Sequence, residues 1–443
     1  MDFEILSRQN IWWIDKRLVD RDIDIKKWRK GKRRWIPLLL DKISLKPFSL
    51  NFIFGPRQVG KTTLLKLLVK RLLESGVDPK KIFYFRCDML SDYKELDEII
   101  NIYLEFRSSH DIEGSYILLD EITYPKEWYR TIKFHIDNGD FQNDVLILTG
   151  SLSMHLKREV ELFPGRRGSG ETYIMLPLSF REFIMIFNPA LYKKLPTLKN
   201  LSRKEILNKI YKTLPYSHEI SRLFNTYLEI GGFPLSIKNE EISEDVLDSY
   251  WAWIRTDLAK IGRNEDIFKR VAKAILEKAS SPLSLNSIAR EFEIGTHKTV
   301  FEYISVMENM FITKVLYWID PNKLVTNFKK NRKVHLTDPL YFKLFSEICL
   351  TKMPKEDIIV ESIIAAVLGR RLSVFHWRDG REIDIVASDG NIVVGLEVKW
   401  REKIGQDYSR IKIGRIKEIY CLTKNKFDPE ANILPAANLL ALI

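Results

Sequence analysis

The chain has 443 residues, roughly three or four domains at typical sizes, and 45% of them are hydrophobic, enough for buried cores. Its 71 Lys and Arg against 59 Asp and Glu give a formal net charge of +12, which suits nucleic acid but also a merely basic protein. No apolar run approaches the roughly 20 residues of a membrane span, and the acidic start is not typical of a secretory signal. Three distant cysteines favour neither a disulfide framework nor a cysteine metal site, so we expect a cytoplasmic protein without a membrane partner.

Residues 1–46 are expected to form a basic, tryptophan-rich arm, in which the run from 26 to 34 reads KKWRKGKRR. Its tryptophans are Trp12, Trp13, Trp28 and Trp35. Dense positive charge beside indole rings is what a surface for phosphates and stacked bases uses. The alternative is a solvated arm whose tryptophans cover the edge of the next domain. We favour the alternative for the tryptophans and leave DNA contact by the basic run open.

A phosphate-binding motif follows the arm. An apolar run, Leu50 to Phe54, leads directly into GPRQVGKT and then into an apolar helical pattern. This order of strand, G-x-x-x-x-G-K-T and helix is typical of a loop whose N–H groups surround phosphates. Lys61 is placed to reach the β- and γ-phosphates of a nucleotide, and Thr62 offers a hydroxyl to Mg²⁺. The residues expected around the nucleotide are Gly55, Pro56, Arg57, Gln58, Val59, Gly60, Lys61, Thr62 and Thr63.

Two carboxylates end a later buried strand. The segment from 116 reads YILLDE, which places Asp120 and Glu121 at its carboxyl end. Behind a phosphate loop, the first acid is expected to hold Mg²⁺ and the second to polarise the attacking water. We therefore predict ATP and Mg²⁺ as cofactors, with Thr62 and Asp120 as metal ligands. Lys61 and Glu121 are the predicted catalytic residues.

Another buried strand, 145–151, carries polar residues at its tip. In parallel nucleotide-binding sheets such a strand lies beside the carboxylate strand, and its tip faces the γ-phosphate. Thr149 or Ser151 is then a phosphate sensor, and the alternative is a plain strand-to-turn signal. Strands that alternate with helices over 50–180 predict a mostly parallel sheet covered on both faces.

The loop from 163 to 170 reads FPGRRGSG, which is basic and rich in glycine. An arginine here, for which we favour Arg166, is a candidate finger that stabilises charge during phosphoryl transfer. It would act in its own chain or in a neighbouring subunit of a homo-oligomer. The alternative is a surface loop that touches a polyanion.

Two further segments complete a recognisable series: LPLSFREF at 176–183 and YLEIGGFP at 227–234. In this order the motifs resemble the archaeal and bacterial AAA-type ATPases of the AAA_14 plus DUF4143 architecture, near the broader archaeal ATPase group. The resemblance covers nearly the whole chain after the arm. It implies an ATPase core over 47–188 and a small helical lid over the nucleotide, placed at 189–262. The arm is longer than the family pattern, so its role is not implied.

Residues 263–340 are expected to form a winged helix-turn-helix domain. The stretch 267–315 reads as three helices, and 285–292 and 296–310 are the pair. The start of the last helix would enter the major groove of DNA, and 311–324 would form a wing. Because such domains also dock proteins, DNA contact and protein docking both stay open.

The remaining segment, 341–443, carries acids and a lysine on helical and strand-like stretches. Residues two apart in a strand share a face, so Glu397 and Lys399 point the same way, beside Asp384 on its neighbour. Two carboxylates can hold Mg²⁺ while a lysine orients a water. The set resembles the PD-(D/E)xK nuclease-like fold, with Glu361, Asp384 and Glu397 as metal ligands and Lys399 as the nuclease lysine. The alternative is a solvated face of an α/β sheet, or a nuclease-like fold that serves another role.

The expected fold class is α/β: a P-loop NTPase domain with a parallel sheet, a helical lid, a winged helix-turn-helix and a restriction-endonuclease-like α/β domain. Two functions are compatible with it. The first is a Mg-dependent AAA-type ATPase that acts on DNA, with metal-dependent nuclease activity in the C-terminal domain. The second is a nucleotide-gated switch or scaffold whose last two domains bind partners without cleaving nucleic acid.

Overall fold

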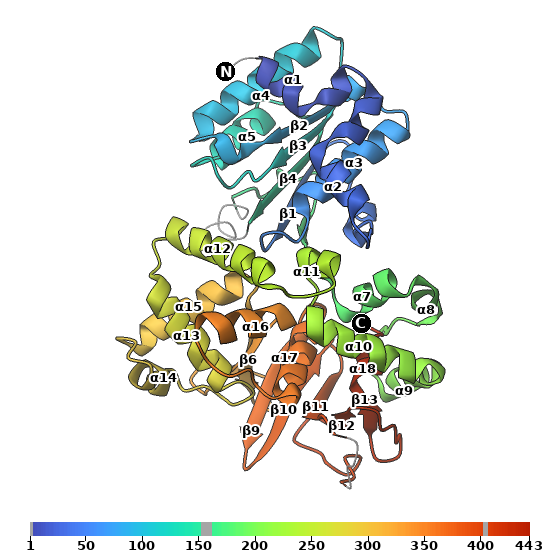
Figure 1. The fold of residues 1–443 in the computed structure, drawn as a ribbon, viewed down its shortest axis with the longest axis vertical. Coiled ribbons are helices and arrows are strands. Elements are labelled where there is room, and N and C mark those ends of the chain that lie inside the picture. The colour runs from blue at the N-terminus through green and yellow to red at the C-terminus, as the bar shows by residue number, and fades with distance from the viewer. Residues whose placement is uncertain (1–2, 152–161, 402–405) are drawn as a thin grey trace. The chain divides into compact units, whose positions relative to one another are not determined.

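The computed structural model describes residues 3–151, 162–401 and 406–443. The chain divides into two compact units, Met1–Leu176 and Pro177–Ile443 (Figure 1). The basic arm is therefore part of the first unit rather than a separate body. The second unit holds the regions that the sequence divides into lid, winged helix and nuclease-like domain. No helix in the described ranges is both long and apolar enough to cross a bilayer.

The first unit is built on a parallel sheet with the strand order β2-β3-β4-β1-β5. Its strands are β1 (Ser49–Gly55), β2 (Ile82–Arg86), β3 (Tyr116–Asp120), β4 (Val145–Ser151) and β5 (Thr172–Ile174). Its helices are α1 (Phe3–Gln9), α2 (Ile23–Lys30), α3 (Lys61–Glu74), α4 (Tyr93–Ser108) and α5 (Tyr129–Asp137). Figure 1 shows α4 and α5 on one face of the sheet and α2 and α3 on the other. The predicted parallel sheet with helices on both faces is confirmed.

The position of β1 explains where polar groups gather. Every residue of β1 is buried, and β1 lies between β4 and β5. A parallel strand covered on both faces is buried along its whole length, and here the two buried polar residues, Ser49 and Asn51, lie at the start of the strand, away from the loop. The register places Ile53 opposite Thr149 and Gly55 opposite Ser151. Because β3, β4 and β1 are parallel neighbours, the phosphate loop and the polar strand tips meet at one edge of the sheet.

The N-terminal segment packs on the edge strand β2. The indole N–H groups of Trp12 and Trp13 both donate to the carbonyl of Ile82, at 3.0 and 2.9 Å. The side chain of Asn10 donates to the carbonyl of Tyr84 at 2.9 Å and accepts from its N–H at 2.7 Å. These bonds satisfy backbone groups that an edge strand otherwise leaves open. The interpretation that tryptophans of the arm cover the edge of the next domain is confirmed for this pair.

The second unit combines helices with a mixed sheet. Its helices are α7 (Phe180–Phe187), α8 (Pro189–Lys194), α9 (Arg203–Thr213), α10 (Ser217–Ile230), α11 (Pro234–Asn239), α12 (Glu244–Lys260), α13 (Glu265–Glu277), α14 (Leu285–Glu291), α15 (His297–Asn309), α16 (Pro339–Ile348), α17 (Glu356–Leu368) and α18 (Ala436–Leu440). Its strands are β6 (Thr313–Ile319), β7 (Thr326–Asn327), β8 (Lys333–Leu336), β9 (Ser373–Asp379), β10 (Arg381–Ser388), β11 (Val393–Lys399), β12 (Glu418–Thr423) and β13 (Ile433–Pro435). The strand order is β13-β12-β11-β10-β9-β6-β7, and β8 also pairs with β6.

The three helices expected between 267 and 315 are confirmed as α13, α14 and α15. Thr296 caps α15 by accepting from the N–H of Thr299 at 3.2 Å, which fixes the helix start. The strand that follows, expected to form a wing, is β6. It pairs in parallel with β9 and antiparallel with β7 and β8. The expected wing is therefore continuous with the C-terminal sheet rather than a free hairpin, because β6 has partner strands on both sides.

The segments LPLSFREF and GGFP meet around Leu178. Its N–H donates to the carbonyl of Gly232 at 2.8 Å, and its carbonyl accepts from the hydroxyl of Tyr227 at 3.0 Å. A Cβ at Gly232 would lie 2.2 Å from that carbonyl oxygen, so only glycine fits. The buried carboxylate of Asp338 accepts from the Gly232 N–H at 2.8 Å, and burial raises the pKa of Asp338 to about 6. Both segments thus form one packing centre of the second unit.

Candidate functional site

The loop between β1 and α3 has the backbone geometry of a phosphate-binding loop. Gln58 and Gly60 adopt left-handed conformations, with φ of 56° and 97°, which let the chain wrap tightly. A Cβ at Gly55 would lie 2.0 Å from the carbonyl oxygen of Met175, so only glycine lets β1 enter the loop here. Because α3 starts at Lys61, the positive end of its dipole lies at the loop.

The side chain of Lys61 is buried within this loop. Its Nζ donates to the carbonyl oxygens of Gly55 and Pro56, at 3.1 and 3.0 Å. These two bonds hold the ammonium at the loop between β1 and α3. This is the place expected for a lysine that contacts phosphates.

Asp120 is the centre of a cluster of hydroxyl groups. Thr62 and Tyr84 donate to its Oδ2 at 2.7 and 3.0 Å, and Thr149 donates to its Oδ1 at 2.5 Å. These partners come from α3, β2 and β4, so three elements orient one carboxylate at the end of β3. Hydroxyls are neutral, so the bonds orient the carboxylate without compensating its charge. A hydroxyl and a carboxylate side by side are oxygen ligands that Mg²⁺ accepts, so Thr62 and Asp120 fit the ion.

Glu121 joins this cluster at the tip of β4. Its backbone is left-handed, with φ of 54°, which is uncommon for a residue other than glycine and turns the chain sharply after β3. Its N–H donates to the hydroxyl of Thr149 at 3.0 Å, and the hydroxyl of Ser151 donates to its Oε2 at 3.5 Å. The structure thus brings together Thr62, Asp120, Glu121 and both candidate phosphate sensors.

An aromatic and charged group lies behind the cluster. The ammonium of Lys66 lies 3.4 Å from the ring centroid of Tyr84 and 5.2 Å from that of Trp12. It also forms an ion pair with Asp22, at 3.1 Å. Burial lowers the pKa of Lys66 and Asp22 opposes the shift, whereas burial and the charge of Asp120 raise the pKa of Tyr84. Tyr84 therefore stays a neutral donor, and the N-terminal segment supplies the counter-charge of the lysine.

Two predicted arginines of this site have other partners. The guanidinium of Arg166 pairs with Asp137 at the end of α5, with Nε 2.7 Å from Oδ1. The structure therefore does not bring Arg166 to the Asp120 cluster, and its role as a finger stays a prediction. Arg57 donates to the hydroxyl of Tyr124 at 3.2 Å, within the same edge of the sheet as the loop.

In the second unit, a group of acids surrounds Lys333. Its Nζ lies 3.0 Å from Glu361 Oε1, 2.8 Å from Glu382 Oε1 and 3.0 Å from Asp384 Oδ1. The lysine comes from β8 and is fully buried, while the acids come from α17 and β10. Burial alone would lower the pKa of Lys333, but the three carboxylates outweigh it and raise the pKa. The cluster therefore contains a permanent cation.

This ammonium lies between Glu361 and Asp384, where the nuclease-like resemblance implies a metal ion. Burial and the charge of Asp384 raise the pKa of Glu361 to about 7, so this acid takes up a proton near neutral pH. Across the described ranges, no set of three or more His, Cys, Asp and Glu side chains is arranged to hold a metal. Because the buried ammonium already pairs with both Glu361 and Asp384, these acids do not fit a divalent cation between them.

The other two nuclease-like residues form a separate pair. Lys399 Nζ lies 2.9 Å from Glu397 Oε1, so their predicted position on one face of β11 is confirmed. Asp384 instead accepts from the N–H of Val398 at 2.8 Å. A cavity of about 370 Å³ is lined by Glu361, Asp384 and Lys399, among others. The predicted acids are thus divided between the Lys333 cluster and the Lys399 pair.

The sequence did not indicate two of these side chains, Tyr84 and Lys333. Lys333 opens KVHL, a strand in which all four residues are buried. A lysine is rarely buried without a partner, so its place in such a strand was the available signal. Tyr84 stands in IFYFR, where tyrosine is an ordinary strand residue, so only the pairing of β2 with β3 reveals its role.

Comparisons with known proteins agree with the geometry of the first unit. Residues 48–184 match the family model AAA_14, an AAA domain. Residues 221–340 match DUF8612, a domain of unknown function, rather than the expected DUF4143. An uncharacterized protein of Methanocaldococcus jannaschii is 23% identical over 330 residues, which are 71% of this chain and 67% of that protein.

Solved structures show weaker likeness. The Aeropyrum pernix ORC1 protein in complex with DNA is 15% identical, covering 76% of this chain and 96% of that chain, with a TM-score of 0.32. The Aeropyrum pernix ORC2 protein in its ADPNP-ADP complexes is 12% identical, covering 70% of this chain and 90% of that chain, with a TM-score of 0.37. At these TM-scores neither likeness carries an argument on function. The strand order, the loop and the AAA domain match define the first unit as a P-loop NTPase fold.

Proposed function

We propose that this chain is a Mg²⁺-dependent ATPase that binds and hydrolyses ATP in its first unit. The contact of 2.7 Å between the Thr62 hydroxyl and the Asp120 carboxylate supports this most directly. It joins the phosphate loop to the carboxylate strand with the two oxygen ligands that the ion prefers. When bound there, Mg²⁺ supplies positive charge that neutralises phosphate oxygens.

The side chains around this contact take separate roles. Lys61 is buried at the loop and holds phosphate charge. Glu121, beside the tip of β4, orients the attacking water and accepts its proton. Thr149 donates to Asp120 and accepts from the Glu121 N–H, so it couples the metal carboxylate to the base. Ser151, whose hydroxyl donates to Glu121 at the tip of β4, would sense the terminal phosphate.

Hydrolysis of ATP with Mg²⁺ by the full chain tests this proposal. Lys61→Ala should lose ATP binding, because the phosphates lose their point charge. Glu121→Gln should keep ATP binding and lose turnover. Lys94→Ala, an exposed lysine on α4, is the matched control and should keep both. Undiminished turnover in Lys61→Ala would refute a nucleotide site at this loop.

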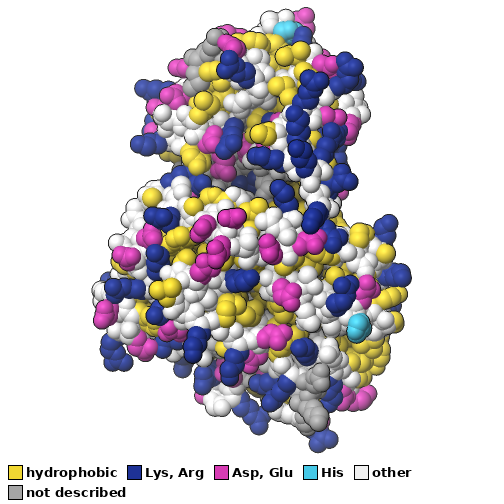
Figure 2. Space-filling model, in the orientation of Figure 1, with side chains coloured by type: hydrophobic (Ala, Val, Ile, Leu, Met, Phe, Trp, Pro, Cys, Tyr) yellow, Lys and Arg dark blue, Asp and Glu magenta, His cyan; other side chains and the backbone are white. Residues whose placement is uncertain are grey.

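We further propose that the protein acts on DNA. The net charge of +12 and the basic run at 26–34 support an anionic partner. The cationic side chains of α2 that are exposed are Lys26, Lys27, Arg29 and Lys30. Figure 2 shows Lys and Arg side chains gathered over α2 and α3 on the visible face of the first unit. A partner DNA would release counterions there, so its affinity should fall steeply with salt.

For the second unit, the Lys333 cluster favours a binding role over cleavage. A metal-dependent nuclease needs carboxylates that a cation can reach, and here a buried ammonium already bridges Glu361 and Asp384. The arrangement supports the second function, in which a nuclease-like domain binds partners without cutting. The full chain should therefore leave DNA intact with Mg²⁺ or Mn²⁺. If the unmodified protein cleaved DNA and Asp384→Ala did not, the second unit would be a nuclease after all.

A further inference from the structure

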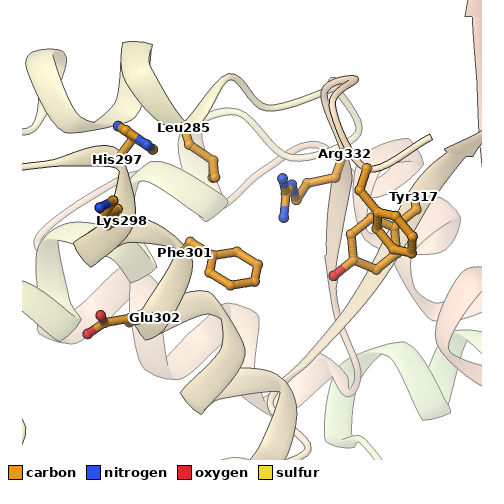
Figure 3. A pocket seen from close by; sticks show the side chains of 8 residues that line it. Leu285, His297, Lys298, Phe301, Glu302, Tyr317 and Arg332 are labelled. Carbon is orange, nitrogen blue, oxygen red and sulfur yellow. The ribbon is translucent and has the colours of Figure 1, made fainter.

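A cavity of about 660 Å³ opens in the second unit between α15 and the strands that follow it (Figure 3). Three aromatic rings line it: Phe301 on α15, Tyr317 on β6, and Phe328 in the segment between β7 and β8. Phe301 is 42% exposed and Phe328 is 66% exposed. Phenylalanine is among the residue types most often buried, so two exposed rings in one hollow indicate a ligand surface rather than a core.

Arg332 lies among these rings. Its Cζ is 5.2 Å from the ring centroid of Phe301 and 5.4 Å from that of Tyr317. Figure 3 shows the Arg332 side chain extending toward Phe301 across the hollow. Its Nε is buried and has no hydrogen-bond partner in the part of the chain that the structure describes. The cavity is thus lined by a guanidinium cation that lies over two aromatic rings.

The charge of the lining favours an anion. His297 and Lys298 lie at the start of α15, where the helix dipole also favours negative charge. The lining acid, Glu302, is already engaged with Arg263 at 2.7 Å. Lys298 and Arg332 therefore give the lining two cations against one acid, Glu302, which is already paired with Arg263. A ligand that offers both a flat apolar face and negative charge matches this surface best.

We propose that this cavity binds single-stranded nucleic acid, with an unpaired base stacked on Phe301 and Phe328. Arg332 and Lys298 would hold the adjoining phosphates. In a duplex the faces of the bases are covered by their neighbours, so a ring inside a hollow stacks only on an unpaired base. The proposal rests on the nucleic-acid part of the proposed function and is independent of ATP hydrolysis. It assigns α15 to a single strand rather than to the major groove of a duplex.

Fluorescence anisotropy of the full chain tests the proposal, with a short labelled single strand and a duplex of the same sequence, without nucleotide. The unmodified protein should bind the single strand more tightly than the duplex. Phe301→Ala and Phe328→Ala should each weaken single-strand binding about 5- to 100-fold, the usual loss for one stacking ring. Phe301→Tyr keeps a flat ring and should restore most of the affinity.

Two controls separate this site from other nucleic-acid contacts. Phe134→Ala removes a ring on α5 that is 55% exposed and should leave the affinity unchanged. Replacing Lys26, Lys27 and Lys30 with Gln should reduce the salt slope for single strand and duplex alike. All variants should keep the unfolding midpoint of the unmodified protein, since the altered side chains are exposed.

Three results would overturn the proposal. Unchanged affinity in both phenylalanine-to-alanine variants removes the stacking site, while binding that depends on the basic run would leave the proposed DNA function intact. Equal losses for duplex and single strand would make the surface a duplex contact. If the full chain bound neither nucleic acid, the cavity would be better explained as a protein-docking surface. The proposal that the protein acts on DNA would then be refuted, whereas the ATPase proposal would be unaffected.

Discussion

The two units hold their buried carboxylates with different kinds of hydrogen-bond donor. Each places carboxylates at or near strand ends in a buried environment. Asp120 is held by the hydroxyls of Thr62, Tyr84 and Thr149, which are neutral donors. Glu361 and Asp384 are held by the ammonium of Lys333, a charged donor that pairs with both.

This difference decides what each set of acids can bind. A buried carboxylate held by neutral donors attracts a cation, because desolvation makes an uncompensated charge costly. A carboxylate that already has a buried ion pair gains little from a second cation. The presence of acids alone therefore does not identify a metal site. Whether their hydrogen-bond donors are neutral or positively charged distinguishes the two clusters.

The largest effect is expected when the second cluster loses its cation. Lys333→Ala leaves buried acids unpaired and should lower the free energy of unfolding by about 3–5 kcal/mol. Lys273→Ala removes a half-buried lysine paired with Glu277 at 3.9 Å and should cost below about 1 kcal/mol. Denaturant midpoints of the unfolding transition measure both. A loss no larger than that of the control would mean that Lys333 does not neutralise the acids.

In the same variant, Lys333→Ala, the acids of the second cluster would no longer be paired with an ammonium, as is already the case for Asp120. Without the ammonium, Glu361, Glu382 and Asp384 are free to attract a divalent cation. Mn²⁺ should therefore raise the unfolding midpoint of Lys333→Ala by more than that of the unmodified protein, since both retain Asp120 and only the variant gains the second site. If Mn²⁺ stabilises both proteins equally, the lysine does not exclude the metal.

At the first cluster, loss of charge should abolish metal-assisted turnover. Asp120→Asn keeps the shape of the side chain but removes its negative charge, so Mg²⁺ is held weakly. We expect ATP hydrolysis to fall about 100-fold or more, which corresponds to about 2.7 kcal/mol. Turnover as a function of Mg²⁺ concentration measures it. Normal turnover at low Mg²⁺ would place the metal ligand elsewhere.

A pH effect of about 3 kcal/mol should follow from His376, a buried histidine near Lys333. Burial, with the charge of Lys333, lowers the pKa of His376 from its model-peptide value of 6.5 to about 4. Between pH 6.5 and about pH 4, His376 is protonated in the unfolded chain but stays neutral in the folded chain. Protonation therefore favours the unfolded state, and the free energy of unfolding decreases as pH falls through this window. The difference in unfolding free energy between the unmodified protein and His376→Gln, followed from pH 7 to pH 4, isolates this contribution, since it should shrink as pH falls.

The smallest change concerns a hydroxyl that only orients the metal carboxylate. Tyr84→Phe keeps the ring against Lys66 but removes the donor to Asp120 Oδ2. The Mg²⁺ concentration for half-maximal hydrolysis should rise about 10-fold, the range found for residues that support a metal ligand. Maximal turnover at saturating Mg²⁺ should change little. A fall in maximal turnover without a shift in Mg²⁺ dependence would give Tyr84 a different role.

The sequence was sufficient wherever the signal is local. The loop 55–63 and the acids at 120 and 121 follow directly after apolar strands, and the structure places them at one sheet edge. The three helices before β6 were predictable from 3.6-residue periodicity for the same reason. Local patterns are set by neighbours in the chain, which the sequence displays.

Contacts between distant segments were not predictable. Lys333 precedes Glu361 by 28 residues and Asp384 by 51, and only the pairing of β8 with β6 fixes where its side chain lies. Tyr84 reaches Asp120 because β2 and β3 are neighbours, which the spacing of their residues does not state. The continuation of the expected wing into the C-terminal sheet was not predictable either, because β6 pairs with β9, a strand more than fifty residues later.

The ion pair of Lys66 with Asp22 has a practical consequence for anyone who shortens this chain. The first 46 residues look dispensable beside the ATPase motifs, and a truncated gene would naturally start just before β1. Such a protein would keep every recognised motif. Its Lys66 would still lie against the ring of Tyr84 but would have lost its ion-pair partner Asp22. If the shortened protein then needed more Mg²⁺ than the full chain, the cause would be the loss of residues 1–46 and not a property of the phosphate loop.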